Sequence, residues 1–298
     1  MPTAGLLVLS LLAAAPAERS GWIEGGGRRI RYGVAGRGMP ILLIHGGLVD
    51  SRMWDDQVAS LSPGHCTIRY DQPGFGRSKA PSAAYSPVED VRAVLDKVGV
   101  SKAVVIGLSH GGQVAIDFAL EYPDRVVALV TAGATVRGQV LEKVGDRPAI
   151  YQALKERGTA EAVRLWLDDP AFVTARDMPG VQNRMRQMLT ANVKAWGTPR
   201  PDLVRWPSRV PADHLGEIGV PTLVLRGGLE NPNILSAADL LAEKIPRASL
   251  RIIPAAGHHL NMEAPEQFDA AVLSFLRESG IEERLDGGAT RPGVGACG

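Results

Sequence analysis

Gly107-Leu108-Ser109-His110-Gly111 is the stretch that decides the fold of this chain. The run before it, Val104-Val105-Ile106, is short and rich in β-branched residues, which is typical of a buried parallel strand. The residues after it have helical period up to Tyr122, where Pro123 ends the predicted helix. Ser109 is therefore predicted on a sharp strand-to-helix turn that presents its hydroxyl above the edge of a sheet.

This position suits Ser109 for nucleophilic catalysis. The flanking glycines leave room for a strained backbone at the serine. The helix N-terminus that follows supplies unpaired N–H groups and a positive dipole end where an oxyanion would form. A helix N-cap without chemical role is the alternative, and the context of the turn favours the nucleophile.

A serine nucleophile needs a base to take its proton. Of the six histidines, only His258 stands just past a late predicted strand, Ser249–Ile253, and before a predicted helix, Pro265–Arg277. His259 is the alternative base, but His258 directly follows the loop glycine Gly257. We therefore interpret His258 as the base.

The third group that such a site needs is a carboxylate to orient the base. It is expected in the loop after the preceding predicted strand, Thr222–Leu225, where Glu230 is the only carboxylate. The rival loop at residues 132–138 contains no Asp or Glu. An exposed loop glutamate is the alternative for Glu230. The order Ser109, Glu230, His258 is nucleophile, acid, base.

Together with this order, four motifs resemble those of α/β-hydrolases of the single-domain esterase, lactonase and C–C hydrolase type. The likeness runs from about Trp22 to Leu276. In one respect the chain departs from the family, which usually has aspartate where this sequence has Glu230. The motifs, in chain order, are His45-Gly46-Gly47, the turn Asp71–Ser78, the elbow at residues 107–112, and Gly257-His258 with Glu263-Ala264-Pro265-Glu266.

The resemblance implies both a site and a fold. The backbone N–H groups of Gly47 and His110 would form the oxyanion hole. The fold would be α/β, a mostly parallel eight-stranded sheet flanked by helices. A haloalkane dehalogenase or epoxide hydrolase would require aspartate at position 109 in place of Ser109, so both classes are disfavoured.

The alternation of strand and helix patterns also predicts a mostly parallel sheet covered on both faces. The predicted hydrolase core comprises residues 21–134 and 218–279. A helix over Pro87–Val98 is predicted to begin at the cap Ser86. The predicted strands are Gly21–Glu24, Arg29–Val34, Ile41–Ile44, Thr67–Tyr70, Ala103–Ile106, Val126–Thr131, Thr222–Leu225 and Ser249–Ile253.

Residues 135–217 break this alternation and are predicted to form a helical cap over the serine. Its amphipathic pieces are Ala149–Lys155, Ala160–Leu167 and Gly180–Trp196. A cap would exclude water and set the pocket for the substrate. Packing within the cap would explain its Trp and Met residues equally well. The candidate pocket residues are Leu48, Trp166, Met185, Met188, Trp196 and His259.

Composition excludes several function classes. Lys and Arg total 33 against 32 Asp and Glu, so nothing indicates a nucleic-acid partner. No segment reaches the about 20 apolar residues of a membrane span. No spacing of His, Cys, Asp or Glu suits a metal, and no Gly-rich loop suits a phosphate or dinucleotide, so no cofactor is expected. Cys66 and Cys297 are expected to be reduced and unpaired.

The two ends of the chain are predicted to lie outside the fold. In the leader, residues 1–20, the run Leu6–Ala15 resembles a secretory h-region and Ala15-Pro16-Ala17 a cleavage site, but Met1–Gly5 has no Lys or Arg. A cytoplasmic location is therefore favoured, and export stays open. The tail, residues 280–298, is rich in Gly and charge and is predicted to be disordered.

These observations predict a serine hydrolase that cleaves a small or medium carboxylic ester or lactone through an acyl-enzyme. A C–C bond hydrolase or an acyltransferase with the same residues is the alternative, because cap residues decide among such reactions. A hydrolase-fold ligand-binding receptor is an alternative of another class. The sequence does not determine the natural substrate or the oligomeric state.

Overall fold

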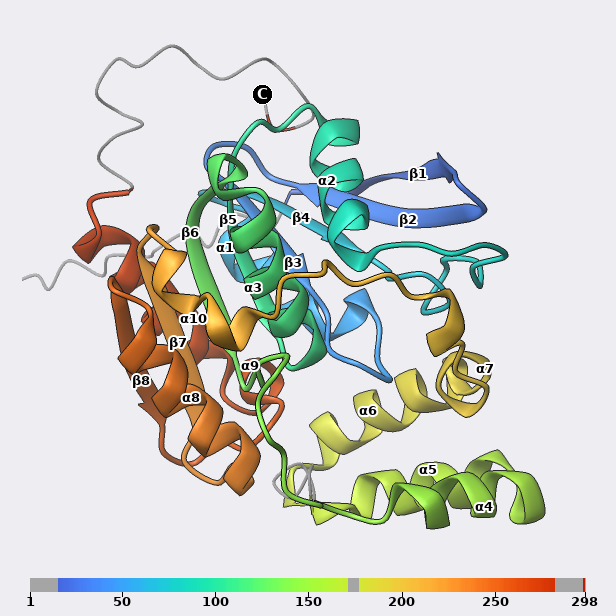
Figure 1. Ribbon diagram of the computed structural model, residues 1–298. Coiled ribbons are helices and arrows are strands. Elements are labelled where there is room, and N and C mark those ends of the chain that lie inside the picture. Colours follow the sequence, from blue (N-terminus) through green and yellow to red (C-terminus); the bar gives the residue numbers. More distant parts are fainter. Residues whose placement is uncertain (1–15, 171–176, 282–296, 298) are drawn as a thin grey trace, which may run out of the picture.

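A central eight-stranded sheet organises the chain (Figure 1). The computed structural model describes residues 16–170, 177–281 and 297. The strand order is β1-β2-β4-β3-β5-β6-β7-β8. The strands are β1 (Arg19–Gly25), β2 (Arg28–Ala35), β3 (Pro40–Ile44), β4 (Cys66–Tyr70), β5 (Ala103–Leu108), β6 (Val126–Ala132), β7 (Thr222–Gly227) and β8 (Ala248–Ile253).

The sheet is mostly parallel, which confirms the predicted fold class. β1 pairs antiparallel with β2, and β2 pairs antiparallel with β4. All other neighbouring pairs, from β4–β3 to β7–β8, are parallel. The carboxyl ends of β3 to β8 therefore meet at one edge of the sheet, where loop residues far apart in sequence come together.

Helices cover both faces of the sheet. Alternate strand residues point to opposite sides, so each face presents apolar side chains to one layer of helices. Leu42 and Ile44 pack with one helix layer, whereas Ile41 and Leu43 pack with the other. The first layer contains α2 (Pro87–Val98), α3 (His110–Glu121) and α8 (Pro232–Lys244). The second contains α1 (Asp55–Leu61), α9 (Leu260–Glu263) and α10 (Pro265–Glu278). Ser86 caps α2 as predicted, since its side chain accepts a hydrogen bond from the Glu89 N–H.

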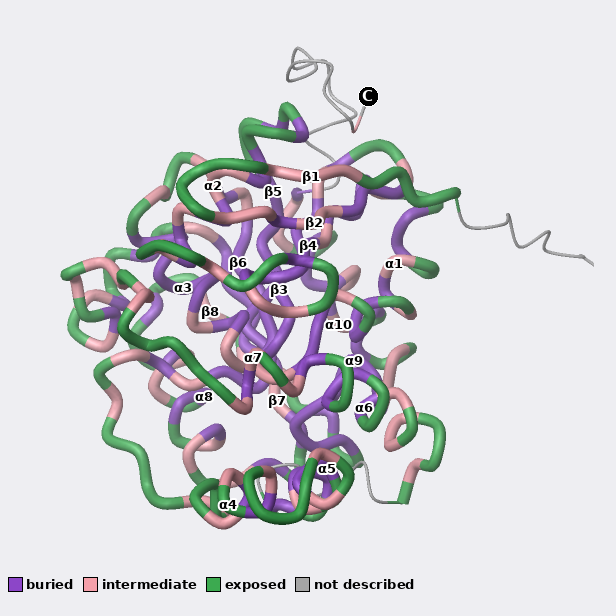
Figure 2. Tube along the Cα trace, turned by 90° about the vertical axis from the view of Figure 1, so that its right-hand side faces the viewer, coloured by how far each residue is buried: buried purple, intermediate pink, exposed green. Residues whose placement is uncertain are grey.

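The segment between β6 and β7, residues 133–221, is called here the helical insertion, and its helices lie at the lower right of Figure 1. The part of the insertion after α7, residues 198–221, is called here the return segment, and it pairs with the core. The Tyr85 N–H donates to the Leu203 carbonyl (2.8 Å), and the Arg205 N–H donates to the Tyr85 carbonyl (2.7 Å). Figure 2 shows the central strands buried and much of α4 exposed. The helices are α4 (Arg147–Arg157), α5 (Thr159–Asp168), α6 (Pro179–Ala191) and α7 (Val193–Gly197).

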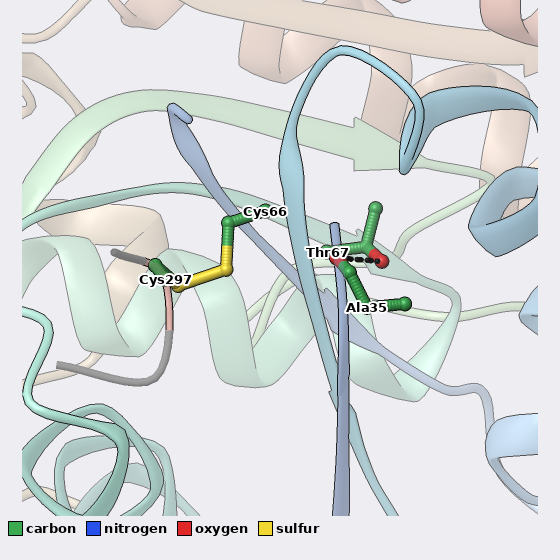
Figure 3. The surroundings of a disulfide bond; sticks show 4 residues. All are labelled: Ala35, Cys66, Thr67 and Cys297. Carbon is green, nitrogen blue, oxygen red and sulfur yellow. Dashed lines mark hydrogen bonds between the residues drawn. A yellow bond between two sulfur atoms is a disulfide. The ribbon is translucent and has the colours of Figure 1, made fainter. Parts of the chain in front are cut away.

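A disulfide joins Cys66 in β4 to Cys297, 231 residues away (Figure 3). The expectation of two reduced, unpaired cysteines is therefore wrong. Cys66 is fully buried, and Cys297 packs against the core layer that contains α2 and α3. Nothing in the local sequence indicates the pairing, because only the folded chain brings Cys297 beside β4.

Loss of this cross-link should lower the stability of the protein. In Cys297→Ser the unfolded chain regains the freedom that a long closed loop removes, so the free energy of unfolding should fall by about 2–4 kcal/mol. Urea unfolding of the variant and the wild type measures the difference, and reductant should affect only the wild type. Two titratable thiols in the unreduced wild type would contradict the disulfide.

Much of the predicted leader and tail falls outside the described residues. Residues 1–15 and 282–296 belong to those predictions and are not described. Within the described part, β1 begins at Arg19, two residues before the predicted strand start at Gly21. Its partner β2 extends through Ala35.

Candidate active site

Ser109 stands on the turn between β5 and α3, with φ 55°. Such a left-handed conformation is uncommon for a residue with a side chain and marks a strained position. The turn is fixed because the Ser109 N–H donates to the Ala132 carbonyl in β6 (2.8 Å). A side chain at Gly107 would meet the Gly111 carbonyl, and one at Gly111 would meet the Ile44 carbonyl. The two glycines of the quoted stretch therefore allow strand and helix to meet this closely.

The structure brings His258 and Glu230 to this serine, across the carboxyl edge of the sheet. His258 Nε2 lies 2.9 Å from Ser109 Oγ. His258 Nδ1 lies 3.2 Å from both carboxylate oxygens of Glu230. The Glu230 side chain is 1% exposed, and it packs against Gly133, where an added Cβ would come 2.7 Å from Oε1. An exposed loop position for Glu230 is therefore wrong.

The buried carboxylate sets the protonation behaviour of His258. Burial alone would lower the pKa of this imidazole, because it disfavours the charged form. The charge of Glu230 and its hydrogen bond oppose burial and raise the pKa of His258 above its ordinary value of 6.5. Glu230 therefore favours the protonated, imidazolium form of His258.

A second buried carboxylate, Glu263, holds the loop that carries His258. It accepts hydrogen bonds from the N–H of Gly257 (2.6 Å) and of His259 (3.0 Å), the residues on either side of His258. Hydrogen bonds to an ionised acceptor are stronger than neutral ones. Glu263 thus fixes the backbone of this loop, a role that the motif match at positions 263–266 did not specify.

The two predicted oxyanion-hole residues lie side by side. His110 is the first residue of α3, so its N–H has no acceptor within the helix. Gly47 lies against it, since an added Cβ on Gly47 would come 3.7 Å from the His110 Cβ. The next residue, Leu48, has φ 71°, and the Gly46 N–H donates to Met53 Sδ (3.2 Å). The loop at residues 46–48 is therefore held in a specific, strained shape beside Ser109.

The ring of His110 faces the return segment of the helical insertion. It contacts Trp206 edge-on, with ring centroids 5.7 Å apart. Enclosure by the protein lowers the pKa of His110 to about 4, so the ring is neutral near pH 7. A neutral ring adds no positive charge beside Ser109.

A small apolar cavity opens beside the predicted oxyanion loop. Of the predicted pocket residues, Leu48, Trp166, Met185 and His259 line it. Met188 and Trp196 are buried but are not among its described lining residues. Met188 lies about 100° around α6 from the lining residue Leu189, and Trp196 packs edge-on against the lining residue Trp166. Gly47, Leu167 and Leu189 complete the lining. Leu167 and Leu189 were missed, although Leu167 directly follows Trp166 and Leu189 follows Met185 by one helical turn.

Comparison with known proteins places this geometry in a family. The model of the alpha/beta hydrolase family matches residues 41–271. The chain belongs to this family. The match includes the predicted elbow, the Glu230 loop and the histidine loop, and it spans the helical insertion.

Relatives within the family are named for several reactions. A protein named as a carbamate hydrolase of Caulobacter sp. strain K31 is 29% identical over 272 residues, 87% of this chain and 98% of the relative. A 2-hydroxy-6-oxo-6-phenylhexa-2,4-dienoate hydrolase of Burkholderia cepacia is 26% identical over 83% of this chain and 91% of its own length. The solved structure of a thermophilic esterase from Thermogutta terrifontis is 27% identical, with a TM-score of 0.70 over 88% of this chain and 99% of that one.

The described residues offer no metal centre and no membrane-spanning helix. No group of three or more His, Cys, Asp or Glu within residues 16–170, 177–281 and 297 could hold a metal ion. In the same part of the chain, no helix is both long and apolar enough to cross a membrane.

Proposed function

We propose that this α/β-hydrolase is a serine hydrolase that cleaves a small carboxylic ester or lactone through an acyl-enzyme. The chain of contacts from Ser109 Oγ to His258 to Glu230 carries the proposal. A hydroxyl at 2.9 Å from an imidazole that is itself bound to a buried carboxylate is the arrangement that activates a serine. The esterase from Thermogutta terrifontis supports the choice of substrate class.

In the first step, His258 Nε2 takes the proton of Ser109 Oγ as this oxygen attacks the carbonyl carbon of the ester. The carbonyl oxygen becomes negatively charged and accepts hydrogen bonds from the N–H groups of Gly47 and His110. Glu230 holds the imidazole in the required tautomer and stabilises the imidazolium. The C–O bond then breaks, and His258 returns the proton to the leaving alcohol, which in a lactone stays attached to the acyl chain.

In the second step, water releases the acyl group. His258 takes a proton from the water, whose oxygen attacks the acyl carbon of the Ser109 ester. The carboxylic acid leaves, and the proton returns to Ser109 Oγ. The same imidazole thus serves as base and acid in both halves of the reaction.

The helical insertion acts as a cap in this proposal. It contributes Trp166 and Leu189 to the cavity beside the oxyanion loop, and its return segment places Trp206 against His110. Apolar walls on this side keep water away from the developing charge, which strengthens the hydrogen bonds to the oxyanion. Access of substrate then depends on the position of these helices.

Pre-steady-state hydrolysis of p-nitrophenyl acetate tests the proposed function. The expected result is a burst of p-nitrophenolate, stoichiometric with enzyme, followed by slower turnover. Mass spectrometry of the quenched protein should show one acetyl group on the peptide that contains Ser109. Release without acetylation of Ser109, or no release with any ester, would contradict the proposal.

C–C bond hydrolysis is a second candidate, favoured by the Burkholderia cepacia relative. It would use the same three residues on a diketone in place of an ester. Turnover of a 2-hydroxy-6-oxodienoate without acetylation by p-nitrophenyl acetate would favour it. Ligand-induced thermal stabilisation without turnover of either compound would instead favour a binding protein.

A further inference from the structure

The cavity beside the oxyanion loop is very small. It is bounded by Gly47 and Leu48 of that loop, by His259, and by side chains of α5 and α6. Its volume is about 10 Å³, close to the least that can hold one water molecule. In the proposed reaction the carbonyl oxygen accepts a hydrogen bond from the Gly47 N–H, which places the carbonyl carbon, with its acyl and alcohol substituents, beside this cavity.

The walls of the cavity are parts of the packed core and resist expansion. Trp166 and Leu189 are each 2% exposed. The Trp166 ring meets the ring of Trp196 edge-on at 6.2 Å, and Trp196 Nε1 donates to the Leu189 carbonyl (2.8 Å). Because protein interiors are close-packed, a longer substrate chain would have to displace these side chains together.

The cavity also offers no positive charge to a substrate. None of its described lining residues is Lys or Arg. Burial and the neighbouring His258 hold the pKa of His259 well below its ordinary value, so this ring is neutral near pH 7. A carboxylate placed here would lose its hydration without gaining a cation, which is costly.

We infer that the acyl half of the substrate is short and uncharged, of acetyl or propionyl size, and that Trp166 and Leu189 set this limit. The inference rests on the proposed function, since it concerns the acyl group transferred to Ser109. Beyond that function, it specifies the size and charge of the acyl group and names α5 and α6 as the helices that select them.

A series of p-nitrophenyl esters tests the inference, because only the acyl chain varies within it. For the wild type, kcat/KM should fall at least about tenfold from acetate to octanoate, whose longer chain must displace packed side chains. The half-ester of succinate should also react at least about tenfold more slowly than butyrate, because its carboxylate must be desolvated.

Leu189→Ala should relax the limit on the length of the acyl chain, because the loss of several side-chain carbon atoms enlarges the cavity. The octanoate-to-acetate ratio of kcat/KM should rise at least about tenfold in this variant. Met188→Ala is the matched control, since Met188 is the preceding residue of α6, is equally buried at 2% exposed, and is not among the lining residues. The control should lose similar stability but keep the wild-type ratio.

The outcomes distinguish a failure of the inference from a failure of the proposed function. Acetylation of Ser109 with equal kcat/KM for acetate and octanoate would overturn the inference and leave the function standing. The inference would also be overturned if the octanoate-to-acetate ratio of kcat/KM changed equally in Leu189→Ala and Met188→Ala. It would likewise be overturned if kcat/KM depended on the alcohol chain of alkyl acetates and not on the acyl chain. No reaction with any ester, and no acylation of Ser109, would overturn the proposed function itself.

Discussion

Replacing Ser109 with alanine should lower kcat for p-nitrophenyl acetate by about 10⁵–10⁶-fold and abolish the burst. The substitution removes the oxygen that attacks the carbonyl carbon and that lies 2.9 Å from His258 Nε2. What activity persists would come from the oxyanion hole and substrate binding alone. Initial rates and burst amplitudes at equal protein concentration measure the effect.

The loss should not reflect unfolding. Alanine lacks only the hydroxyl oxygen, and the backbone contact of position 109 with Ala132 stays. The thermal midpoint should therefore remain near that of the wild type. Ser101→Ala, at an exposed serine just before the other end of β5, is the control and should keep full activity. A Ser109→Ala enzyme with a rate within a few fold of the wild type would exclude Ser109 as the nucleophile.

Glu230→Gln should lower kcat by about 10³–10⁴-fold with little change in shape. An amide cannot enforce the tautomer with a proton on His258 Nδ1, and it does not stabilise the imidazolium. The pH profile supplies a second readout. Because Glu230 raises the pKa of His258, the wild-type kcat/KM should rise with pH through an apparent pKa above 6.5, and this acid limb should move to lower pH in the variant.

Two further glutamine variants make the result specific to Glu230. Glu266→Gln changes an exposed carboxylate at the start of α10 and should alter neither the rate nor the pH profile. If Glu230→Gln kept a rate within a few fold of the wild type, its assignment as the acid would be refuted. Glu263→Gln would then be compared, because Glu263 is the other buried carboxylate whose charge raises the pKa of His258.

The sequence by itself determined the strands of the sheet and the loops that carry the candidate site residues. The β-branched runs and their turn residues located every strand of the sheet, within a few residues at each end. The elbow around Ser109 was predictable because a strand, a tight turn and a helix follow one another within the span of local interactions. His258 and Glu230 could be found for a related reason, since each stands in the loop after a recognisable strand and parallel strands bring such loops to one edge.

Tertiary structure alone decided which side chains line the cavity and that Cys66 pairs with Cys297. The sequence marked Met185 and Met188 as candidate pocket residues, but the packing of α6 beside Gly47 and Leu48 decided that Leu189 lines the cavity and Met188 does not. The bond between Cys66 and Cys297 likewise depends on the position of Cys297 beside β4 in the folded chain. The physical reason is common to both: apolar patterning shows that a residue is buried, whereas its partner depends on the close packing of segments that are distant in sequence.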